Sequence, residues 1–291
     1  GTYRVKIDEN TKTIGVAKST VTTGLEPTSF WLVGAATPGG WSWTGNNETE
    51  LPVVSNNIYE VPVRLTNNQT FAEKMIIDWD KVGVAMVTYN SEERIKQSAF
   101  TVPDKLKHFF IVNDGTPYEE GSYPSNAHII QHEVNKSVGQ AKNSAIQYLM
   151  SQGCEHIFIM EDDILIKDEN VFDQYIKTSV STGIKHLNYA LQGPANKKGS
   201  KGFESLEERA KLNNLTEPNP RQVVTYPDGI EVALYPNSVG SFSYYNREVI
   251  EKIGLFDPIY KNAWEHVDHT LEAYKNGFTT PYWWFADINK S

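Results

Sequence analysis

The fold is decided by the stretch His156-Ile157-Phe158-Ile159-Met160-Glu161-Asp162-Asp163. Its apolar run is continuous, as expected of a strand that is covered on both faces. The carboxylates that follow repel one another, which makes a hard divalent cation a natural partner. An acidic strand-to-loop turn that binds no ligand would have the same sequence. Other parts of the chain are needed to distinguish a cation site from such a turn.

Two earlier apolar runs also end in polar residues. Residues 82–88 lead into Tyr89 and Asn90, and residues 109–112 lead into Asn113-Asp114-Gly115. Helical patterns begin near Glu92 and cover residues 139–150, so strands alternate with helices and predict a mostly parallel sheet. Ligands in such sheets bind at the carboxyl ends of the strands, which is where all three polar clusters fall.

Composition limits the partners of this chain. Its 291 residues suit one large domain or two modest ones, and its net charge of -9 argues against a nucleic-acid partner. A divalent cation and backbone amides could still hold an anionic nucleotide. The single cysteine, Cys154, lies in an apolar setting and excludes an internal disulfide and a cysteine zinc site. We expect no transmembrane segment and no signal peptide, because no apolar run approaches about 18 residues.

The composition of the chain changes near residue 79. Residues 1–78 read as short strands between turn residues and predict a small antiparallel β-sandwich. Residues 80–291 hold the alternating strands and helices. Within them, residues 192–221 are rich in lysine, glycine and proline, so they form either a solvated excursion or a loop that closes over substrate.

The ordered motifs of residues 80–291 resemble the inverting, GT-A fold glycosyltransferases of family 2. The matching segments are residues 87–90, 111–116, 135–143, 158–163, 254–257, 265–268 and 277–278. The resemblance implies a Rossmann-like, mostly parallel sheet flanked by helices, a UDP-sugar donor, a carbohydrate acceptor and Mn²⁺ or Mg²⁺ as cofactor.

The resemblance also implies roles for individual residues. The metal that bridges the diphosphate would be bound by Asp163, and the ribose or donor sugar by Asp162. Asp114 would hydrogen-bond the uracil or ribose. The remaining residues of the nucleotide-sugar site would be Thr88, Tyr89, Asn90, Asn113, Asn135, Gly139 and Asn143.

The catalytic base is the point at which this sequence departs from the family. Family members have Glu-Asp where this chain has Glu265-His266. A base must take a proton from the acceptor hydroxyl, and Glu265, His266 and Asp268 all compete for that role. We favour Glu265, which shares a helix face with Asp268. His266 or His269 could instead complete the metal shell.

Aromatic residues are the candidates for sugar contacts. Trp283 and Trp284 lie in a dense aromatic run that serves either as core or as an acceptor platform. Residues 30–43 resemble the β-sandwich modules of starch-binding outer-membrane lipoproteins, which implies that Trp41 and Trp43 bind glycan.

Together these features predict an inverting, metal-dependent transfer of a hexose from a UDP-sugar to a carbohydrate acceptor, in surface or capsular polysaccharide synthesis. The resemblance implies a cytoplasmic location, with peripheral association at the inner face of the membrane as an option. The alternative function is that of a glycan-binding protein whose transferase-like domain is inactive. The altered Glu265-His266 pair is the reason for this alternative. A nucleotidyltransferase would need a glycine-rich phosphate loop after residue 88, which the chain lacks.

Overall fold

The structure is a computed structural model, and it describes residues 77–200, 205, 207, 208 and 217–289. Before residue 77 it describes only the backbone of short strands. The chain divides into two compact units, Gly1–Thr70 and Phe71–Ser291, and each is described by itself.

The first unit contains three antiparallel strand pairs among its described residues. They are β1 (Tyr3–Asp8) with β2 (Thr13–Lys18), β3 (Phe30–Trp31) with β4 (Glu50–Leu51), and β5 (Val53–Ser55) with β6 (Ile58–Tyr59). Antiparallel strands are therefore present where the sequence predicts them. The predicted sandwich packing and the residues Trp41 and Trp43 lie outside the described residues.

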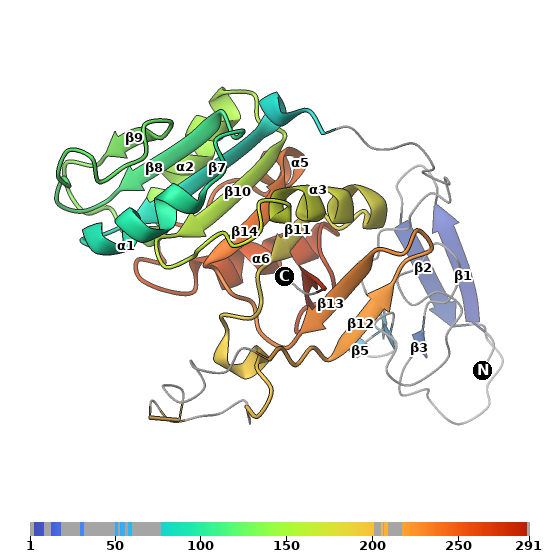
Figure 1. Cartoon of the computed structure of the whole chain (residues 1–291). Coiled ribbons are helices and arrows are strands. Elements are labelled where there is room, and N and C mark those ends of the chain that lie inside the picture. The colour runs from blue at the N-terminus through green and yellow to red at the C-terminus, as the bar shows by residue number, and fades with distance from the viewer. Residues whose placement is uncertain are drawn as a thin grey trace. The chain divides into compact units, whose positions relative to one another are not determined.

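The second unit is built on a sheet with the strand order β11-β14-β10-β7-β8-β9 (Figure 1). Its strands are β7 (Val82–Thr88), β8 (His108–Asn113), β9 (His128–Gln131), β10 (His156–Glu161), β11 (His186–Asn188) and β14 (Phe242–Asn246). Strands β7 to β10 are mutually parallel, and β14 is antiparallel to both of its neighbours. The prediction of an α/β fold with a mostly parallel sheet is confirmed.

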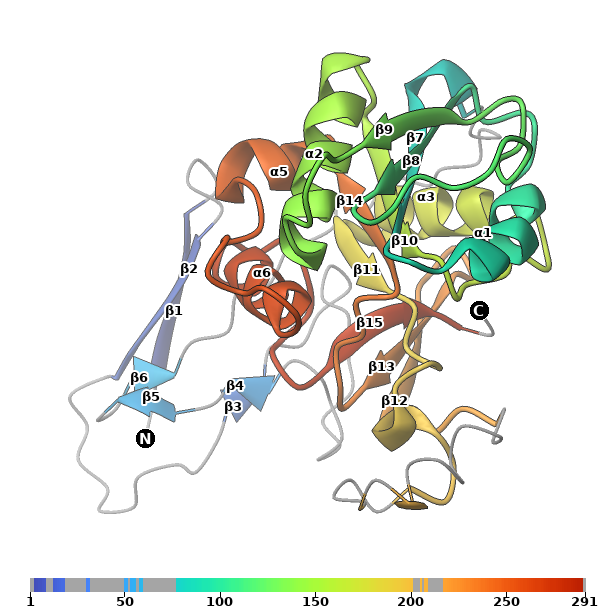
Figure 2. The same cartoon turned by 90° about the vertical axis from the view of Figure 1, so that its left-hand side faces the viewer.

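The helices cover both faces of this sheet (Figure 2). One face packs against α2 (Val138–Ser151), α5 (Arg247–Ile253) and α6 (Glu265–Lys275), and the other against α1 (Glu92–Ser98) and α3 (Val171–Thr182). Successive residues of β10 alternate between the two cores, with Phe158 on the α3 side and Ile159 on the α2 side. This double coverage is why the strands read as continuous apolar runs. Short 3-10 turns lie at η1 (Trp79–Lys81), η2 (Ala99–Thr101) and η3 (Pro194–Asn196).

A second, antiparallel sheet packs on the α3 side of the core. It consists of β12 (Gln222–Thr225), β13 (Glu231–Tyr235) and β15 (Phe285–Ile288). The sequence pattern predicts no strand at these positions. Strand β15 begins at Phe285, so the end of the aromatic run 282–285 belongs to this sheet and its core.

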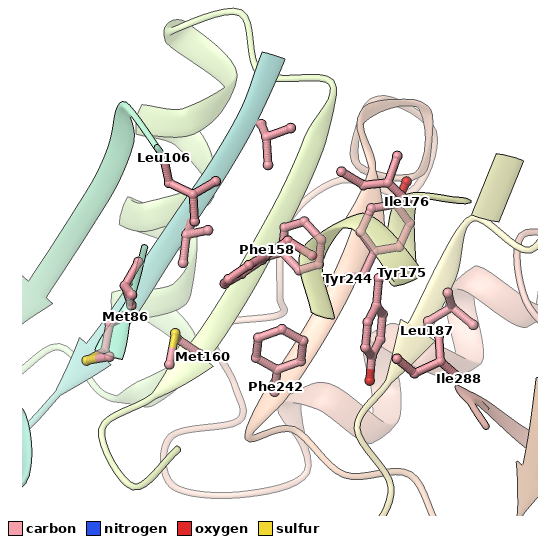
Figure 3. Close-up of a cluster of buried hydrophobic side chains, with 14 of the residues drawn as sticks. Met86, Leu106, Phe158, Met160, Tyr175, Ile176, Leu187, Phe242, Tyr244 and Ile288 are labelled. Carbon is pink, nitrogen blue, oxygen red and sulfur yellow. The ribbon is translucent and has the colours of Figure 1, made fainter. Parts of the chain in front are cut away.

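An aromatic cluster fills the space between the main sheet and α3 (Figure 3). Phe158 has no exposed surface, and its ring centroid lies 4.9 Å from that of Phe172 and 5.1 Å from that of Tyr244. Phe242 and Tyr175 complete the cluster at 5.7 and 6.1 Å from Phe158. Strand β10 is thus anchored directly before the acidic turn that it presents.

Replacement of this anchor should be costly. We expect Phe158→Ala to lower the free energy of unfolding by about 3–5 kcal/mol, because it removes a buried ring and leaves a cavity. Phe100→Ala makes the same change at a side chain that is 54% exposed, and should cost under about 1 kcal/mol. Urea denaturation of both variants makes the comparison. Equal losses would contradict the position of Phe158 at the centre of the core.

Candidate functional site

The predicted polar clusters meet at one edge of the main sheet. In the strand register Thr88 lies opposite Asn113, and Glu161 lies opposite Val87. Because β14 is antiparallel, it begins at this same edge, where the backbone N–H of Glu161 donates to the carbonyl of Ser241 at 2.8 Å. The carboxyl ends of three parallel strands and the start of β14 therefore surround one site.

Asp162 is held in place from β7 and α1. The Thr88 hydroxyl donates to Oδ2 of Asp162 at 2.6 Å, and the Arg94 guanidinium lies 3.7 Å from Oδ1. Burial raises the pKa of Asp162, and its contacts with Thr88 and Arg94 oppose that rise without cancelling it. Tyr118 fixes Thr88 in turn, with 2.8 Å between the two hydroxyl oxygens. Asp162 is thus a positioned carboxylate with little freedom.

Asp163 points outward and has the properties of a cation ligand. It is exposed, and its Oδ2 accepts a hydrogen bond of 2.9 Å from the Gln192 amide. Desolvation and then the neighbouring carboxylates of Glu161 and Asp162 raise the pKa of Asp163. A divalent cation would relieve this repulsion, because Mg²⁺ and Mn²⁺ accept one or two carboxylates together with phosphate oxygens.

No ready-made metal cage exists in the described part of the chain. None of the described His, Cys, Asp and Glu residues forms a group of three or more that could hold a metal. One or two carboxylates completed by substrate oxygens fit the residues that are present. The structure thus fits a cation that arrives with its substrate and that Asp163 would hold.

The loops after β7 and β8 are joined to each other. The side-chain oxygen of Asn90 accepts from the backbone N–H of Thr116 at 3.0 Å, and the Asn113 side chain bonds Gly115 N and Thr116 O. A Cβ on Gly115 would lie 2.4 Å from Oδ1 of Asn90, so this close approach requires glycine. Tyr89, which is 54% exposed, directly follows Thr88, whose hydroxyl bonds Asp162.

Asp114 anchors the loop that leads into α2. Its carboxylate accepts the backbone N–H groups of Lys136 and Ser137, both at 2.8 Å, and contacts the His132 ring at 2.6 Å. Asn135 is exposed, and its side-chain oxygen accepts the N–H of Ser137. Asp114 is 3% exposed, and its hydrogen bonds in this structure stabilise the conformation of this loop. Its contact with a nucleotide stays a prediction.

The predicted residues of α2 face α6 and the segment before it. A Cβ on Gly139 would lie 3.2 Å from the Tyr260 carbonyl and 3.6 Å from Cβ of Glu265. The Asn143 amide bonds both the N–H and the carbonyl of Phe256, each at 2.9 Å. These residues set the distance between α2 and residues 254–265, and their part in a nucleotide pocket stays a prediction.

A buried lysine joins the sheet edge to α6. The ammonium of Lys142 lies 2.7 Å from Oε1 of Glu161, 2.9 Å from Oε1 of Glu265 and 3.1 Å from the Gly240 carbonyl. Burial by itself would lower the pKa of Lys142, but the two carboxylates outweigh it and raise the pKa. Three elements, α2, β10 and α6, are therefore held by one cation.

Glu265 is the carboxylate that this cation neutralises. It is 2% exposed, and its Oε1 also lies 3.3 Å from Nδ1 of His266. Burial by itself would raise its pKa, but His266 and Lys142 overcome that effect and hold the pKa of Glu265 well below its usual range. A carboxylate held in its ionised form in this way is a weak proton acceptor.

Asp268, a candidate for the base, and His269, a candidate for the metal ligand, lie on different sides of α6. Asp268 contacts the Tyr260 hydroxyl at 3.4 Å. The His269 ring lies 4.3 Å from the Phe256 ring and 5.4 Å from the Tyr245 ring, and its Nε2 bonds the Gly254 carbonyl at 2.9 Å. Burial lowers the pKa of His269 to about 4.

The position of His269 in the core does not favour its assignment as a metal ligand, and that assignment stays a prediction. Tyr245 lies opposite Ile157 within the sheet, whereas Asp163 follows the end of β10 at Glu161. A histidine packed against Tyr245 and Phe256 fills the core between α6 and the sheet. The pattern of histidines in sequence could not show which face of α6 each one occupies.

The aromatic candidates differ from one another. Trp283 is 57% exposed and has a φ of 73°, whereas Trp284 packs against the core with the Arg221 guanidinium 5.3 Å from its ring centre. Trp264 was not singled out in the sequence; it is 67% exposed, directly precedes Glu265 and has a φ of 74°.

Sequence reasoning also missed Lys142, Arg94, Tyr118 and Gln192. A signal existed for Lys142, because it shares the helix face of Ala145, Ile146 and Leu149, where a charge has to be paired. The other three come from loops and a short helix whose contacts are not visible in a local pattern.

Comparison with known proteins gives one relative in sequence. No family model matches the chain. An uncharacterized glycosyltransferase of Acanthamoeba polyphaga mimivirus is 25% identical over 212 residues, covering 67% of this chain and 74% of that protein. The chain is therefore similar to a glycosyltransferase over most of its length.

Solved structures with a similar architecture are longer and more distant. The mannosyltransferase PcManGT from Pyrobaculum calidifontis, in complex with GDP-Man and Mn²⁺, is 15% identical with a TM-score of 0.45, covering 69% of this chain and 55% of that one. S. aureus TarS is 16% identical with a TM-score of 0.45, covering 72% of this chain and 56% of that one. The chain thus spans about half the length of these structures.

Among the described residues, no helix combines the length and the apolar character that crossing a membrane requires.

The Lys142 cluster makes a direct prediction about stability. Lys142→Met should lower the free energy of unfolding by about 3–5 kcal/mol, because it leaves the Glu265 carboxylate buried without its cation. The double variant Lys142→Met/Glu265→Gln should lose less than the sum of the single variants. Urea denaturation measures all three.

The control for this prediction is an exposed ion pair on α6. Lys275 lies 2.6 Å from Glu272, with both side chains exposed, and Lys275→Met should cost under about 1 kcal/mol. A Lys142→Met variant as stable as Lys275→Met would show that the buried ion pairs do not hold these elements together.

Proposed function

We propose that this chain is a metal-dependent glycosyltransferase that uses a nucleotide-sugar donor. The observation that supports this most is the acidic turn Glu161-Asp162-Asp163 at the carboxyl edge of the sheet, where Asp162 is fixed and Asp163 is free to bind a cation. The sequence similarity to a viral glycosyltransferase points the same way. The finer assignment is an inverting transfer of a hexose from a UDP-sugar to a carbohydrate acceptor, in surface or capsular polysaccharide synthesis.

The chain's own residues divide the work of this reaction. The exposed ring of Tyr89 and the loop of Asn90 and Asn113 offer a surface for the nucleotide base. Asp162, positioned by Thr88, faces the ribose or the donor sugar. Asp163 would hold Mn²⁺ or Mg²⁺, which when bound neutralises charge on the leaving diphosphate.

The acceptor would enter from the side of α6. Trp264 and Trp283 both expose more than half of their surface, and an indole face can cover the C–H face of a sugar ring. Inversion follows if the acceptor hydroxyl attacks the anomeric carbon from the face opposite the diphosphate in one step.

A second candidate is a glycan-binding protein with an inactive transferase-like domain. One observation favours it: Glu265, the residue at the family's base motif, is buried and ion-paired with Lys142. Turnover of any nucleotide sugar by the wild-type protein would dismiss this candidate.

The metal assignment predicts cation-dependent binding of UDP. Calorimetry should give tighter UDP binding in Mn²⁺ than in EDTA, and Asp163→Asn should abolish the difference. Because the pKa of Asp163 is raised, the Mn²⁺ effect should fade on acidification at a higher pH than for an isolated aspartate, whose pKa is about 3.9.

The matched control is Glu169→Gln, which removes an exposed carboxylate from the same loop. It should leave the Mn²⁺ effect intact. If UDP binds equally with Mn²⁺ and with EDTA, or if both variants behave alike, Asp163 is not the metal ligand.

We also propose that the two units are separate domains, a β-domain of residues 1–78 that binds glycan through Trp41 and Trp43 and a catalytic domain of residues 80–291. The buried cores described above lie within residues 82–288, which supports independent folding of the second domain. A fragment of residues 77–291 should therefore unfold cooperatively on heating, when followed by circular dichroism. An unfolded or insoluble fragment would show that the first unit is needed.

A further inference from the structure

The altered Glu265-His266 pair has a geometry of its own, and the inference from it rests on the proposed function. Glu265 cannot easily reach an acceptor hydroxyl, because its side chain is 3% exposed and its Oε1 is shared by Lys142 and His266. It stays ionised under these contacts. An ionised carboxylate can only accept hydrogen bonds, so the hydrogen between the two residues belongs to Nδ1 of His266.

This assigns the tautomer of His266. With Nδ1 donating to Glu265, the lone pair of the ring lies on Nε2. The ring is the more accessible partner, with 23% of the His266 side chain exposed. No hydrogen bond to its Nε2 is found among the described residues.

The ring also lies at the sheet edge that forms the site. A Cβ on Gly240 would be only 2.6 Å from Cγ of His266, so a glycine is needed to admit the imidazole. Gly240 precedes Ser241, whose carbonyl accepts the N–H of Glu161. His266 is therefore placed beside the acidic turn, whereas Asp268 faces Tyr260 and His269 packs in the core.

The charged and titratable groups around His266 come from four elements. They are Glu265 on α6, Lys142 on α2, Glu161 on β10 and His186 on β11. Burial lowers the pKa of His186 to about 3, so it is neutral near pH 7. Among these four groups, Glu265 is the one with a hydrogen bond to the His266 ring in the described part of the chain.

We propose that His266 is the general base of the transfer, that Glu265 is its orienting carboxylate, and that Lys142 is the positioning residue that holds Glu265. Nε2 of His266 takes the proton of the acceptor hydroxyl while the oxygen of that hydroxyl forms a bond to the anomeric carbon. The bond between that carbon and the diphosphate oxygen breaks, and its electron pair leaves with the nucleoside diphosphate. The imidazolium that forms is stabilised by Glu265 and then releases its proton to water.

The first test is independent of turnover. Long-range ¹H–¹⁵N NMR of the full chain near pH 8 should show His266 as the tautomer with the hydrogen on Nδ1, assigned by its loss in His266→Asp. Glu265→Gln should shift this signal. The tautomer with the hydrogen on Nε2 would overturn the proposed orientation, whatever the enzyme does.

The second test follows kcat for hydrolysis of UDP-sugars in Mn²⁺, with water as the acceptor, against pH. The wild type should lose activity on acidification, because a protonated imidazole cannot accept the proton of the acceptor. His266→Ala should lower kcat at least about a hundredfold with UDP affinity unchanged. His266→Asp should recover activity and keep it to a lower pH than the wild type, because a carboxylate is a weaker base than an imidazole. Glu265→Gln should lower kcat more than it changes KM.

The control is Glu272→Gln, which removes an exposed carboxylate from the same helix and should leave the pH profile unchanged. Near-normal turnover in His266→Ala, an unmoved acid limb in His266→Asp, or loss of activity only in Asp268→Asn would overturn the assignment while the transferase itself stands. A wild type that binds no UDP and turns over no UDP-sugar would instead overturn the proposed function, and the base with it.

Discussion

The ammonium group of Lys142 is the constraint on which the candidate site depends. It is buried between Glu161 and Glu265, and a buried charge without partners is expensive enough that all three side chains must stay together. Glu161 belongs to β10 and Glu265 begins α6, so the contact fixes the distance between the acidic turn and the helix that carries Glu265 and His266. The Gly240 carbonyl adds the start of β14 to the same point.

Around this constraint the site divides into a rigid half and an open half. Asp162, Thr88 and Asp114 are buried and fully engaged by neighbouring groups, so they hold the shape of the edge. Asp163 and Tyr89 are exposed, and the Asp163 carboxylate accepts a hydrogen bond from the Gln192 amide. Catalytic sites that bind a charged donor need this combination, since preorganised walls fix the geometry and exposed groups meet the ligand.

Sequence was sufficient for the parts that depend on local pattern. The strand ends at Thr88 and Glu161 were predictable, because buried parallel strands read as continuous apolar runs and ligands gather where they stop. It was insufficient where partners are far apart in the chain. Lys142 meets Glu265 across 123 residues, and the face of α6 on which His269 lies depends on packing against Tyr245. The antiparallel course of β14 likewise has no local signature.

We propose that Asp163 binds a divalent cation together with a nucleotide sugar. The most direct measurement is the manganese anomalous signal in a crystal of the whole chain grown with UDP and Mn²⁺. We expect a manganese ion at about 2.0–2.2 Å from a carboxylate oxygen of Asp163 and in contact with the diphosphate. UDP bound elsewhere, or manganese with no contact to Asp163, would contradict it.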